Sequence, residues 1–278
     1  MPAVSVVVPV YNVKELLPLC LDSIAGQTFT DFECILVDDG STDGSSAVCD
    51  EYAAKDSRFR VLHRANGGVC SARNAGIRAA AGEFVVFCDQ DDLFAPRLLE
   101  LALEAQHRQP EDLIVWPYVR EREAFAAQPE APGHTVYDRR HLLDYLAGDM
   151  MIYVWNKLLP RSVLAAMPAL FDESLIGGGE DFDFVARFMP VFFQQHPQGC
   201  VRQINAPLYF WNLENEKSVS KWGANSQGYS VRQLAFFAKI KQAFPDFYEQ
   251  DEEQIARCFN RLIRPMIFGF TLAKKNGE

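Results

Sequence analysis

The chain has 278 residues, of which 49% are hydrophobic, and this is enough for one large domain or one domain with a substantial extension. Its formal net charge of −10 argues against general nucleic-acid binding, which relies on basic patches, but it allows a nucleotide ligand whose charge a metal offsets. The seven cysteines include no CxxC pair, so the sequence indicates no zinc framework.

The N-terminal residues 1–5 lack the basic start and the cleavage site of a signal peptide. No uninterrupted apolar stretch reaches the ~18 residues that a membrane-spanning helix needs. An odd number of cysteines without a pattern fits a reducing compartment better than secretion. We therefore expect a cytoplasmic protein.

Strands and helices alternate over the first hundred residues. Continuous apolar runs predict buried strands, and apolar residues at helical spacing predict the helices between them. Such alternation with short connections predicts an α/β fold, with a mostly parallel sheet flanked by helices. The expected strands are 4–10, 32–37, 60–63 and 84–88, and the expected helices are 14–26, 45–55 and 71–80.

The pattern is less regular after residue 110. Proline and glycine predict a surface loop, and three consecutive glycines predict a flexible hinge before a helix. The expectations, in chain order, are a strand over 112–117, a loop over 121–137, a helix over 139–147, the hinge at 177–179, a helix over 180–188, a long strand or strand pair over 200–211, and helices over 229–275.

Three acidic residues and one glutamine close the fourth strand of the first half, in the order Asp89, Gln90, Asp91 and Asp92. Three carboxylates at one strand end repel one another, so we expect a cation between them. Ligands of open α/β sheets also bind at this edge, and hard divalent cations bridge carboxylates to substrate phosphates. Helix N-caps are the alternative, but they explain one Asp better than three.

The first two strands end in residues suited to a nucleotide. No Gly-rich turn follows the first strand, which excludes the usual dinucleotide and Walker A sites. Tyr11 can stack on a base or simply line the rim. Asp38 and Asp39 follow the second strand, where a carboxylate can accept hydrogen bonds from a base or ribose, although an Asx-turn and helix cap would also use such residues.

Arg73 is expected in the first turn of the helix after the glycine pair 67–68, facing the same sheet edge. Its planar guanidinium suits a phosphate or an acidic cluster, and the alternative is a solvated surface arginine.

Four segments in this order resemble the family 2 glycosyltransferases, namely Val4–Asn12, Val37–Asp43, Ala72–Gly76 and Asp89–Asp92. The resemblance covers about the first hundred residues closely and weakens after residue 110. It implies the GT-A fold and an inverting transfer from a nucleotide diphosphate sugar, commonly a UDP-sugar. It also implies that Asp39 contacts the base, that Asp89 lies near the ribose, and that Asp91, with Asp92, serves a divalent metal, Mn²⁺ or Mg²⁺. The expected donor-binding residues are Pro9, Tyr11, Asn12, Asp39, Arg73, Asp89 and Gln90.

The segment 177–184 resembles the Glu-Asp segment that carries the catalytic base of this family. An inverting transfer needs a carboxylate near the acceptor hydroxyl, on an element separate from the metal cluster. Asp181 is the predicted base, and Glu180 is the second candidate. Asp183 is expected to be structural, as an acid at a helix start.

Two later features resemble the family less specifically. Trp155, Asn156 and Lys157 match a segment common in bacterial members, where packing of Trp155 in the core is favoured over a role in the acceptor site. Lys217 lies in a segment similar to one that closes over the donor. Residues 255–273 form a basic amphipathic pattern that can cover the protein's own core, lie on a membrane near a lipid-linked acceptor, or pair with a second copy of the chain.

We therefore expect a metal-dependent inverting hexosyl- or N-acetylhexosaminyltransferase that acts on a saccharide or lipid-linked acceptor in bacterial surface polysaccharide synthesis. Residues 1–110 would form the nucleotide-sugar half, 111–212 the acceptor half, and 213–278 a mobile loop and helical extension. The alternatives are a sugar-phosphate nucleotidyltransferase, whose basic Gly-rich loop is absent from 10–14, and a non-catalytic nucleotide-sugar binding protein.

Overall fold

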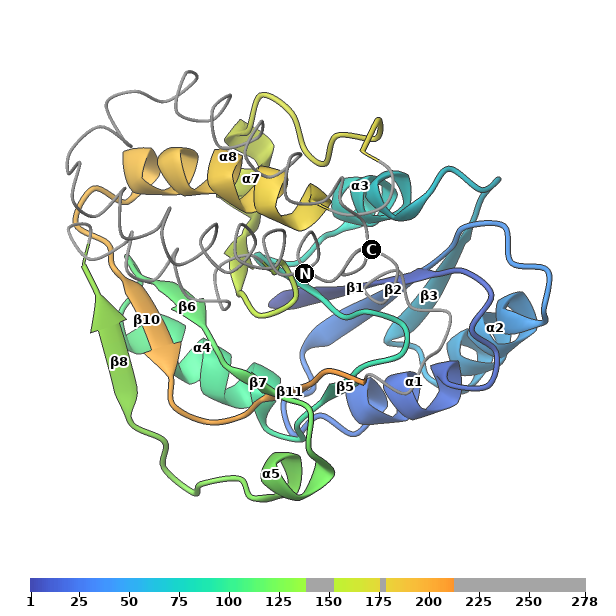
Figure 1. The fold of residues 1–278 in the computed structure, drawn as a ribbon, viewed down its shortest axis with the longest axis horizontal. Helices are drawn as coiled ribbons and strands as arrows, with labels where there is room; N and C mark the ends of the chain where they lie inside the picture. Colours follow the sequence, from blue (N-terminus) through green and yellow to red (C-terminus); the bar gives the residue numbers. More distant parts are fainter. Residues whose placement is uncertain (139–152, 176–178, 213–278) are drawn as a thin grey trace, which may run out of the picture.

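The computed structural model describes residues 1–138, 153–175 and 179–212. Its centre is a five-stranded sheet with the order β3-β2-β1-β4-β9 (Figure 1). Strands β1 to β4 run parallel, and the short β9 is antiparallel to β4. The predicted mostly parallel sheet is therefore confirmed. Its strands are β1 (Val4–Val10), β2 (Phe32–Asp38), β3 (Phe59–His63), β4 (Phe84–Phe87) and β9 (Leu159–Pro160).

The valine-rich run makes β1 the central strand. All seven of its residues are buried, and Val6 pairs with Cys34 of β2 and Val86 of β4. A strand covered on both faces needs apolar side chains on both, which is why the run does not alternate with polar residues.

Helices cover both faces of this sheet. They are α1 (Leu17–Ala25), α2 (Ser45–Lys55) and α3 (Val69–Ala79), and Figure 1 shows α3 on one side and the other two on the opposite side. Helix α3 packs closely on β1, because a Cβ on Gly76 would lie 2.2 Å from Cγ1 of Val7. It begins two residues earlier than predicted, so Arg73 lies in its second turn rather than its first.

The strand order reverses at β1. From β1 the chain moves outward to β2 and β3, then returns to the other side of β1 as β4. The carboxyl ends of β1 and β4 are therefore adjacent at the point where open α/β sheets bind ligands. The segments that follow them begin at Tyr11 and Cys88.

Two smaller sheets complete the fold, with the orders β6-β10-β8 and β5-β11-β7. Their strands are β5 (Leu93–Phe94), β6 (Leu113–Val115), β7 (Tyr118–Val119), β8 (His134–Tyr137), β10 (Val201–Ile204) and β11 (Tyr209–Phe210). The accompanying helices are α4 (Leu98–Arg108), α5 (Arg122–Ala126), α7 (Arg161–Ala166) and α8 (Glu180–Gln195).

The elements after residue 92 differ from the expectations in several places. Helices α4 and α7 were not predicted, and the expected loop over 121–137 contains α5 and β8. The expected strand pair over 200–211 is instead two strands in different sheets. Helix α8 continues past Pro190, because a buried row of stacked aromatic side chains outweighs the hydrogen bond that proline removes. That row is Phe184, Phe188 and Phe192.

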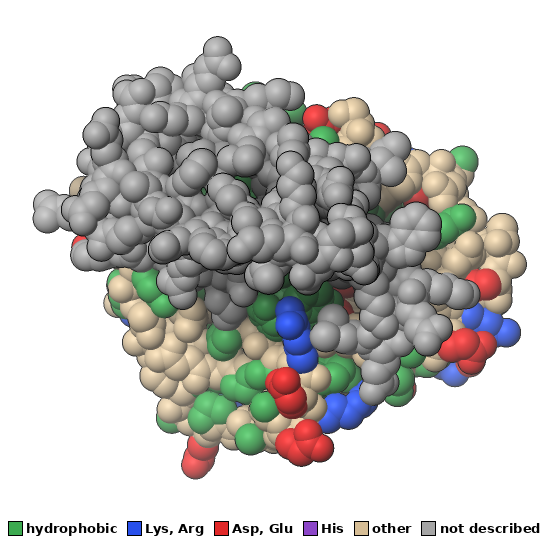
Figure 2. Space-filling view, in the orientation of Figure 1, with side chains coloured by type: hydrophobic (Ala, Val, Ile, Leu, Met, Phe, Trp, Pro, Cys, Tyr) green, Lys and Arg blue, Asp and Glu red, His purple; other side chains and the backbone are tan. Residues whose placement is uncertain are grey.

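Among the residues that the model describes, no helix combines the length and apolar character needed to cross a bilayer. On the described part of the face in Figure 2, acidic and basic side chains are interspersed rather than gathered by sign. The predicted helices over 139–147 and 229–275, Lys217 and the amphipathic pattern over 255–273 lie outside the described residues.

Candidate active site

The turns after β1 and β4 are joined by Gln90. Its side-chain oxygen accepts a 2.6 Å hydrogen bond from the backbone N–H of Tyr11, and its amide nitrogen donates to the Tyr11 carbonyl at 3.3 Å. The Tyr11 side chain stays 46% exposed, while Pro9 is buried within β1. Gln90 therefore fixes the position from which an exposed tyrosine ring can meet a planar base.

Asn12 connects the β1 end to the loop after β2. Its backbone has a positive φ of 49°, which asparagine tolerates better than most residues. Its side-chain oxygen accepts from the Thr42 N–H at 2.8 Å, and its own N–H donates to the Ser41 hydroxyl at 3.2 Å. Asn12 thus shapes the loop wall, and its contact with a donor stays a prediction.

Asp39 is almost fully buried and holds the loop that leads into α3. Its carboxylate accepts hydrogen bonds from the N–H groups of Gly67 and Gly68, the shortest at 2.7 Å, and lies 3.0 Å from Nε of Arg64. Gly68 has a φ of +85°, which favours glycine there. The predicted contact between Asp39 and a base is untested, and the geometry gives this carboxylate a structural role as well.

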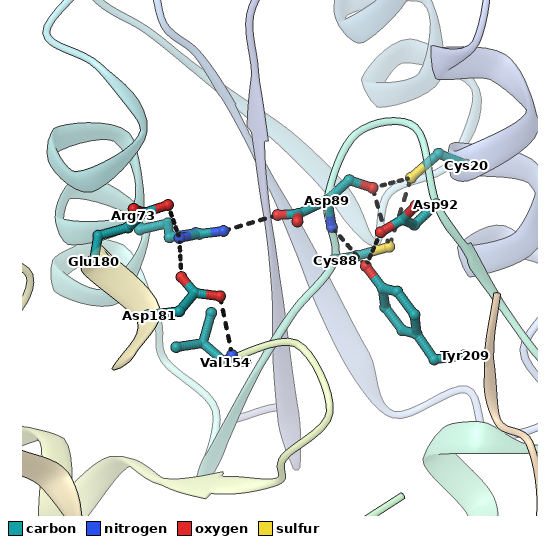
Figure 3. Close-up of polar contacts among 9 residues, drawn as sticks. All are labelled: Cys20, Arg73, Cys88, Asp89, Asp92, Val154, Glu180, Asp181 and Tyr209. Carbon is teal, nitrogen blue, oxygen red and sulfur yellow. Dashed lines mark hydrogen bonds and ion pairs between the residues drawn. The ribbon is translucent and has the colours of Figure 1, made fainter. Parts of the chain in front are cut away.

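Asp92 fastens the acidic turn to β11. The Tyr209 hydroxyl donates to one carboxylate oxygen at 2.7 Å (Figure 3). The Asn212 N–H donates to the other at 2.8 Å. The Tyr209 hydroxyl also accepts from the Asp89 N–H at 3.1 Å. Burial, together with the charges of Asp91 and Asp89, raises the pKa of Asp92. These bonds compete with the predicted metal-binding role of Asp92.

Arg73 lies between two carboxylates that come from different elements (Figure 3). Its Nη2 is 2.9 Å from Oδ1 of Asp89, and its Nη1 is 2.6 Å from Oδ1 of Asp181 and 3.9 Å from Oε1 of Glu180. The guanidinium also lies over the ring of Phe171. Only 3% of Arg73 is exposed, so the acidic-cluster interpretation of this arginine holds within the described structure and the solvated one does not.

Asp181 stands in the first turn of α8, which begins immediately after Gly179. That glycine has a φ of +94°, a conformation that L side chains rarely adopt. Burial raises the pKa of the Asp181 carboxyl to about 7, although Arg73 and a 3.3 Å hydrogen bond from the Val154 N–H favour its charged form. Asp183, two residues on, pairs with Arg187 instead, as expected for a structural residue.

Aromatic side chains pack in and around the segment whose Val154 N–H contacts Asp181. Trp155 is buried, as predicted, and stacks on Tyr153 at 4.6 Å and on Tyr209 at 4.2 Å between ring centroids. We call this group the aromatic cluster, and its members are Tyr118, Tyr153, Trp155, Tyr209 and Trp211. Tyr209 was not among the predicted site residues, because nothing in its short apolar strand indicates its hydrogen bonds to Asp89 and Asp92.

The described residues at this edge offer few ligands for a metal. Within 1–138, 153–175 and 179–212, no group of three or more His, Cys, Asp or Glu side chains is arranged to hold a metal ion. Mg²⁺ is commonly held by one or two carboxylates plus substrate phosphates, which requires no such group. The half-buried Asp91, adjacent to the buried Asp92, fits this kind of shared site.

Comparisons with known proteins show what this chain is similar to. The family model described as glycosyl transferase family 2 matches residues 5–164. EpsJ of Bacillus subtilis (strain 168), named an uncharacterized glycosyltransferase, is 34% identical over 181 residues, which is 63% of this chain and 52% of EpsJ. EpsH of the same strain also carries a glycosyltransferase name and is 34% identical over 80% of this chain and 64% of its own. The chain thus spans about half to two thirds of these relatives.

Solved structures show the same fold. The crystal structure of S. aureus TarS 1-349 in complex with UDP-GlcNAc matches with a TM-score of 0.66 and 19% identity, over 100% of this chain and 75% of that one. The mannosyltransferase PcManGT from Pyrobaculum calidifontis, in complex with GDP-Man and Mn²⁺, matches with a TM-score of 0.57 and 18% identity, over 98% and 80%. At these identities the likeness establishes the fold, and the expected GT-A fold is confirmed.

Proposed function

Because the chain belongs to glycosyltransferase family 2, we propose that it transfers a sugar from a nucleotide diphosphate, in particular UDP, to a saccharide or lipid-linked acceptor with inversion. The UDP-GlcNAc complex of S. aureus TarS supports a UDP-sugar donor. A chondroitin synthase from Pasteurella multocida, 36% identical over 37% of this chain and 11% of its own, supports a role in polysaccharide synthesis.

One observation carries the proposal, namely that Arg73 joins the donor edge to the base. Asp89 follows β4 at the switch point of the sheet, and Asp181 begins α8, yet both accept from the same guanidinium. Removing charged groups from water costs free energy. Clusters of charged groups with shifted pKa values are often found at functional sites. The arrangement supports Asp181 as the proton acceptor beside the expected sugar position.

Asp181 has the properties of a general base. A carboxyl with a pKa of about 7 is half ionised near neutral pH and can take a proton with useful driving force. In the proposed step the acceptor hydroxyl oxygen bonds to the anomeric carbon, and its proton passes to Asp181. The bond from that carbon to the diphosphate breaks, and the nucleotide diphosphate leaves with the electron pair.

The donor contacts follow the strand ends. Tyr11 would stack on the base, Asp39 would accept from its edge, and Asp89 would accept from the ribose. A divalent cation bound at Asp91 would neutralise charge on the departing diphosphate. Arg73 would hold Asp89 and Asp181 in separate positions, because Nη2 donates to Asp89 and Nη1 donates to Asp181.

The aromatic cluster supports a saccharide as acceptor. Small-molecule sites are lined mainly by aromatic and apolar side chains with a few polar groups that fix orientation. Tyr118 and Trp211 are partly exposed, and Arg120 lies over both rings. Sugar rings present apolar C–H faces that pack against such side chains.

The proposal is tested by supplying the protein with Mn²⁺, a panel of UDP- and GDP-sugars and candidate acceptors, and measuring released nucleotide diphosphate. The parent should release it with at least one donor. Asp181→Asn keeps the shape but removes the proton acceptor, so single-turnover transfer should fall by ~10²–10⁴ while donor affinity changes little.

Glu180→Gln serves as the matched control, since its carboxylate neighbours the same arginine. If Glu180→Gln stops transfer and Asp181→Asn does not, the base is Glu180. Parental rates in both variants would place the base elsewhere and contradict the assignment.

A further inference from the structure

Lys157 is an unusual residue to find in a protein core. It is fully buried in the segment 153–158, between the aromatic cluster and β9. Isolating an ammonium group from water costs several kcal/mol by order of magnitude, and an apolar side chain of similar length would avoid that cost. Core packing alone therefore does not account for a lysine at this position.

The side chain of Lys157 folds back across the turn that precedes it. Its Nζ donates to the Tyr153 carbonyl at 2.5 Å and to the Asn156 side-chain oxygen at 2.6 Å. The backbone is anchored independently, because Lys157 pairs with Val115 and the Leu158 N–H donates to Ile114 in β6. The ammonium thus links the two ends of the turn 153–157, while the backbone at the end of the turn is bonded to β6.

That turn faces the base. Val154, inside the closed turn, donates its N–H to Oδ2 of Asp181 at 3.3 Å. The other charged or titratable groups around Asp181, within the described structure, are Arg73 and Cys70 of α3, Glu180 of α8 and Asp89 at the end of β4. Two of these, Glu180 and Asp89, are carboxylates that disfavour its ionised form, and a cation in addition to Arg73 would offset them.

We propose that Lys157 is a positioning residue for the catalytic base: it closes the turn that aims the Val154 N–H at Asp181, and its charge favours the ionised carboxylate. This rests on the proposed function, in which Asp181 accepts a proton. Burial lowers the pKa of Lys157 to about 7, and the negative charge of Asp181 raises it. The two groups therefore titrate in the same pH range.

The first test needs no substrate. The carboxyl ¹³C resonance of Asp181, assigned with Asp181→Asn, is titrated in the parent and in Lys157→Met. Loss of the cation should move the Asp181 midpoint up by about one unit. Lys55→Met is the matched control, because this exposed lysine pairs with Glu51 in α2 and should leave the midpoint unchanged.

The reciprocal measurement covers the case in which Lys157→Met does not fold. In Asp181→Asn the ¹³Cε midpoint of Lys157 should fall, because the ammonium loses its neighbouring negative charge. An unchanged lysine midpoint, or an unchanged Asp181 midpoint in a folded Lys157→Met variant, would overturn the proposal.

Activity gives the third readout. In Lys157→Met the acidic limb of single-turnover transfer should move to higher pH, so that the rate well below the parent's midpoint falls about tenfold while donor affinity is retained. A slower rate with an unmoved limb would contradict the electrostatic role. The absence of any transfer by the parent would instead overturn the proposed function, and the titrations would still decide whether the two groups are coupled.

Discussion

Asp91 and Asp92 are adjacent carboxylates in different surroundings. Asp92 is 1% exposed and accepts from Tyr209 and Asn212, whereas Asp91 is only partly buried. We expect Asp91→Asn to abolish metal-dependent UDP binding without changing the melting temperature, because a neutral amide is a poorer ligand for a hard cation. Calorimetry with UDP and Mn²⁺ measures the first effect and thermal unfolding measures the second.

Asp92→Asn is the matched comparison, and it should show the opposite pattern. One end of an asparagine side chain is an NH₂ group, so one of the two donors would lose its acceptor, which costs about 1–3 kcal/mol of stability. If Asp92→Asn unfolds at the parental temperature and loses metal-dependent binding, the carboxylate is a metal ligand as first predicted.

At the level of single residues, the sequence indicated which side chains meet but not all of their bonds. Carboxylates that follow parallel strands lie at the same edge of the sheet. A guanidinium near them is expected to bind a carboxylate or a phosphate. The link from Tyr209 to Asp92 joins positions 117 residues apart, and no local pattern encodes it. For the same reason the hydrogen bonds from Gly67 and Gly68 to Asp39 appear only in the folded chain.

At the scale of elements, the start of α8 is set by Gly179. Its φ of +94° would cost an alanine roughly 1 kcal/mol or more, because a Cβ crowds the backbone in that region. Gly179→Ala should lower the melting temperature by a few degrees. It should also slow transfer more than it weakens donor binding, since Asp181 lies two residues on. Thermal unfolding and single-turnover rates check both effects.

Gly133→Ala provides the control, because a Cβ there would have ordinary contact with Asn205 at 3.8 Å and its φ lies outside the positive range. If the two alanine variants behave alike, the conformation at Gly179 does not position the base.

The elements of the first half were predicted more accurately than those of the second. Strands β1, β2 and β4 are almost entirely buried and consist mainly of apolar runs, and helix α1 has one apolar side. In the second half, strands such as β7 and β11 have two residues each, which is too short for any periodicity. Helix α4 did carry a recognisable signal, since 98–105 is rich in leucine, alanine and glutamate, which favour helices.

At the scale of the whole molecule, the site draws on both halves of the fold. Asp89 belongs to the parallel sheet, Asp181 to the second half, and β9 extends the central sheet with a strand from that second half. A donor bound at the sheet edge would therefore contact residues from both halves of the fold. Ligands that bind only the folded state stabilise it by about 2.7 kcal/mol at 100 times their dissociation constant.

We therefore expect UDP with Mn²⁺ to raise the melting temperature by several degrees, and a chelator to remove most of that rise. The physical reason is that Asp89 and Asp91 are carboxylates at the edge where a diphosphate would lie, so the phosphates bind poorly without a cation between them. Uridine is the control ligand, because it has no phosphates and its smaller shift should survive chelation. A UDP shift that persists with the chelator would show that Arg73 or other cations hold the diphosphate, and the metal would then have no part in donor binding.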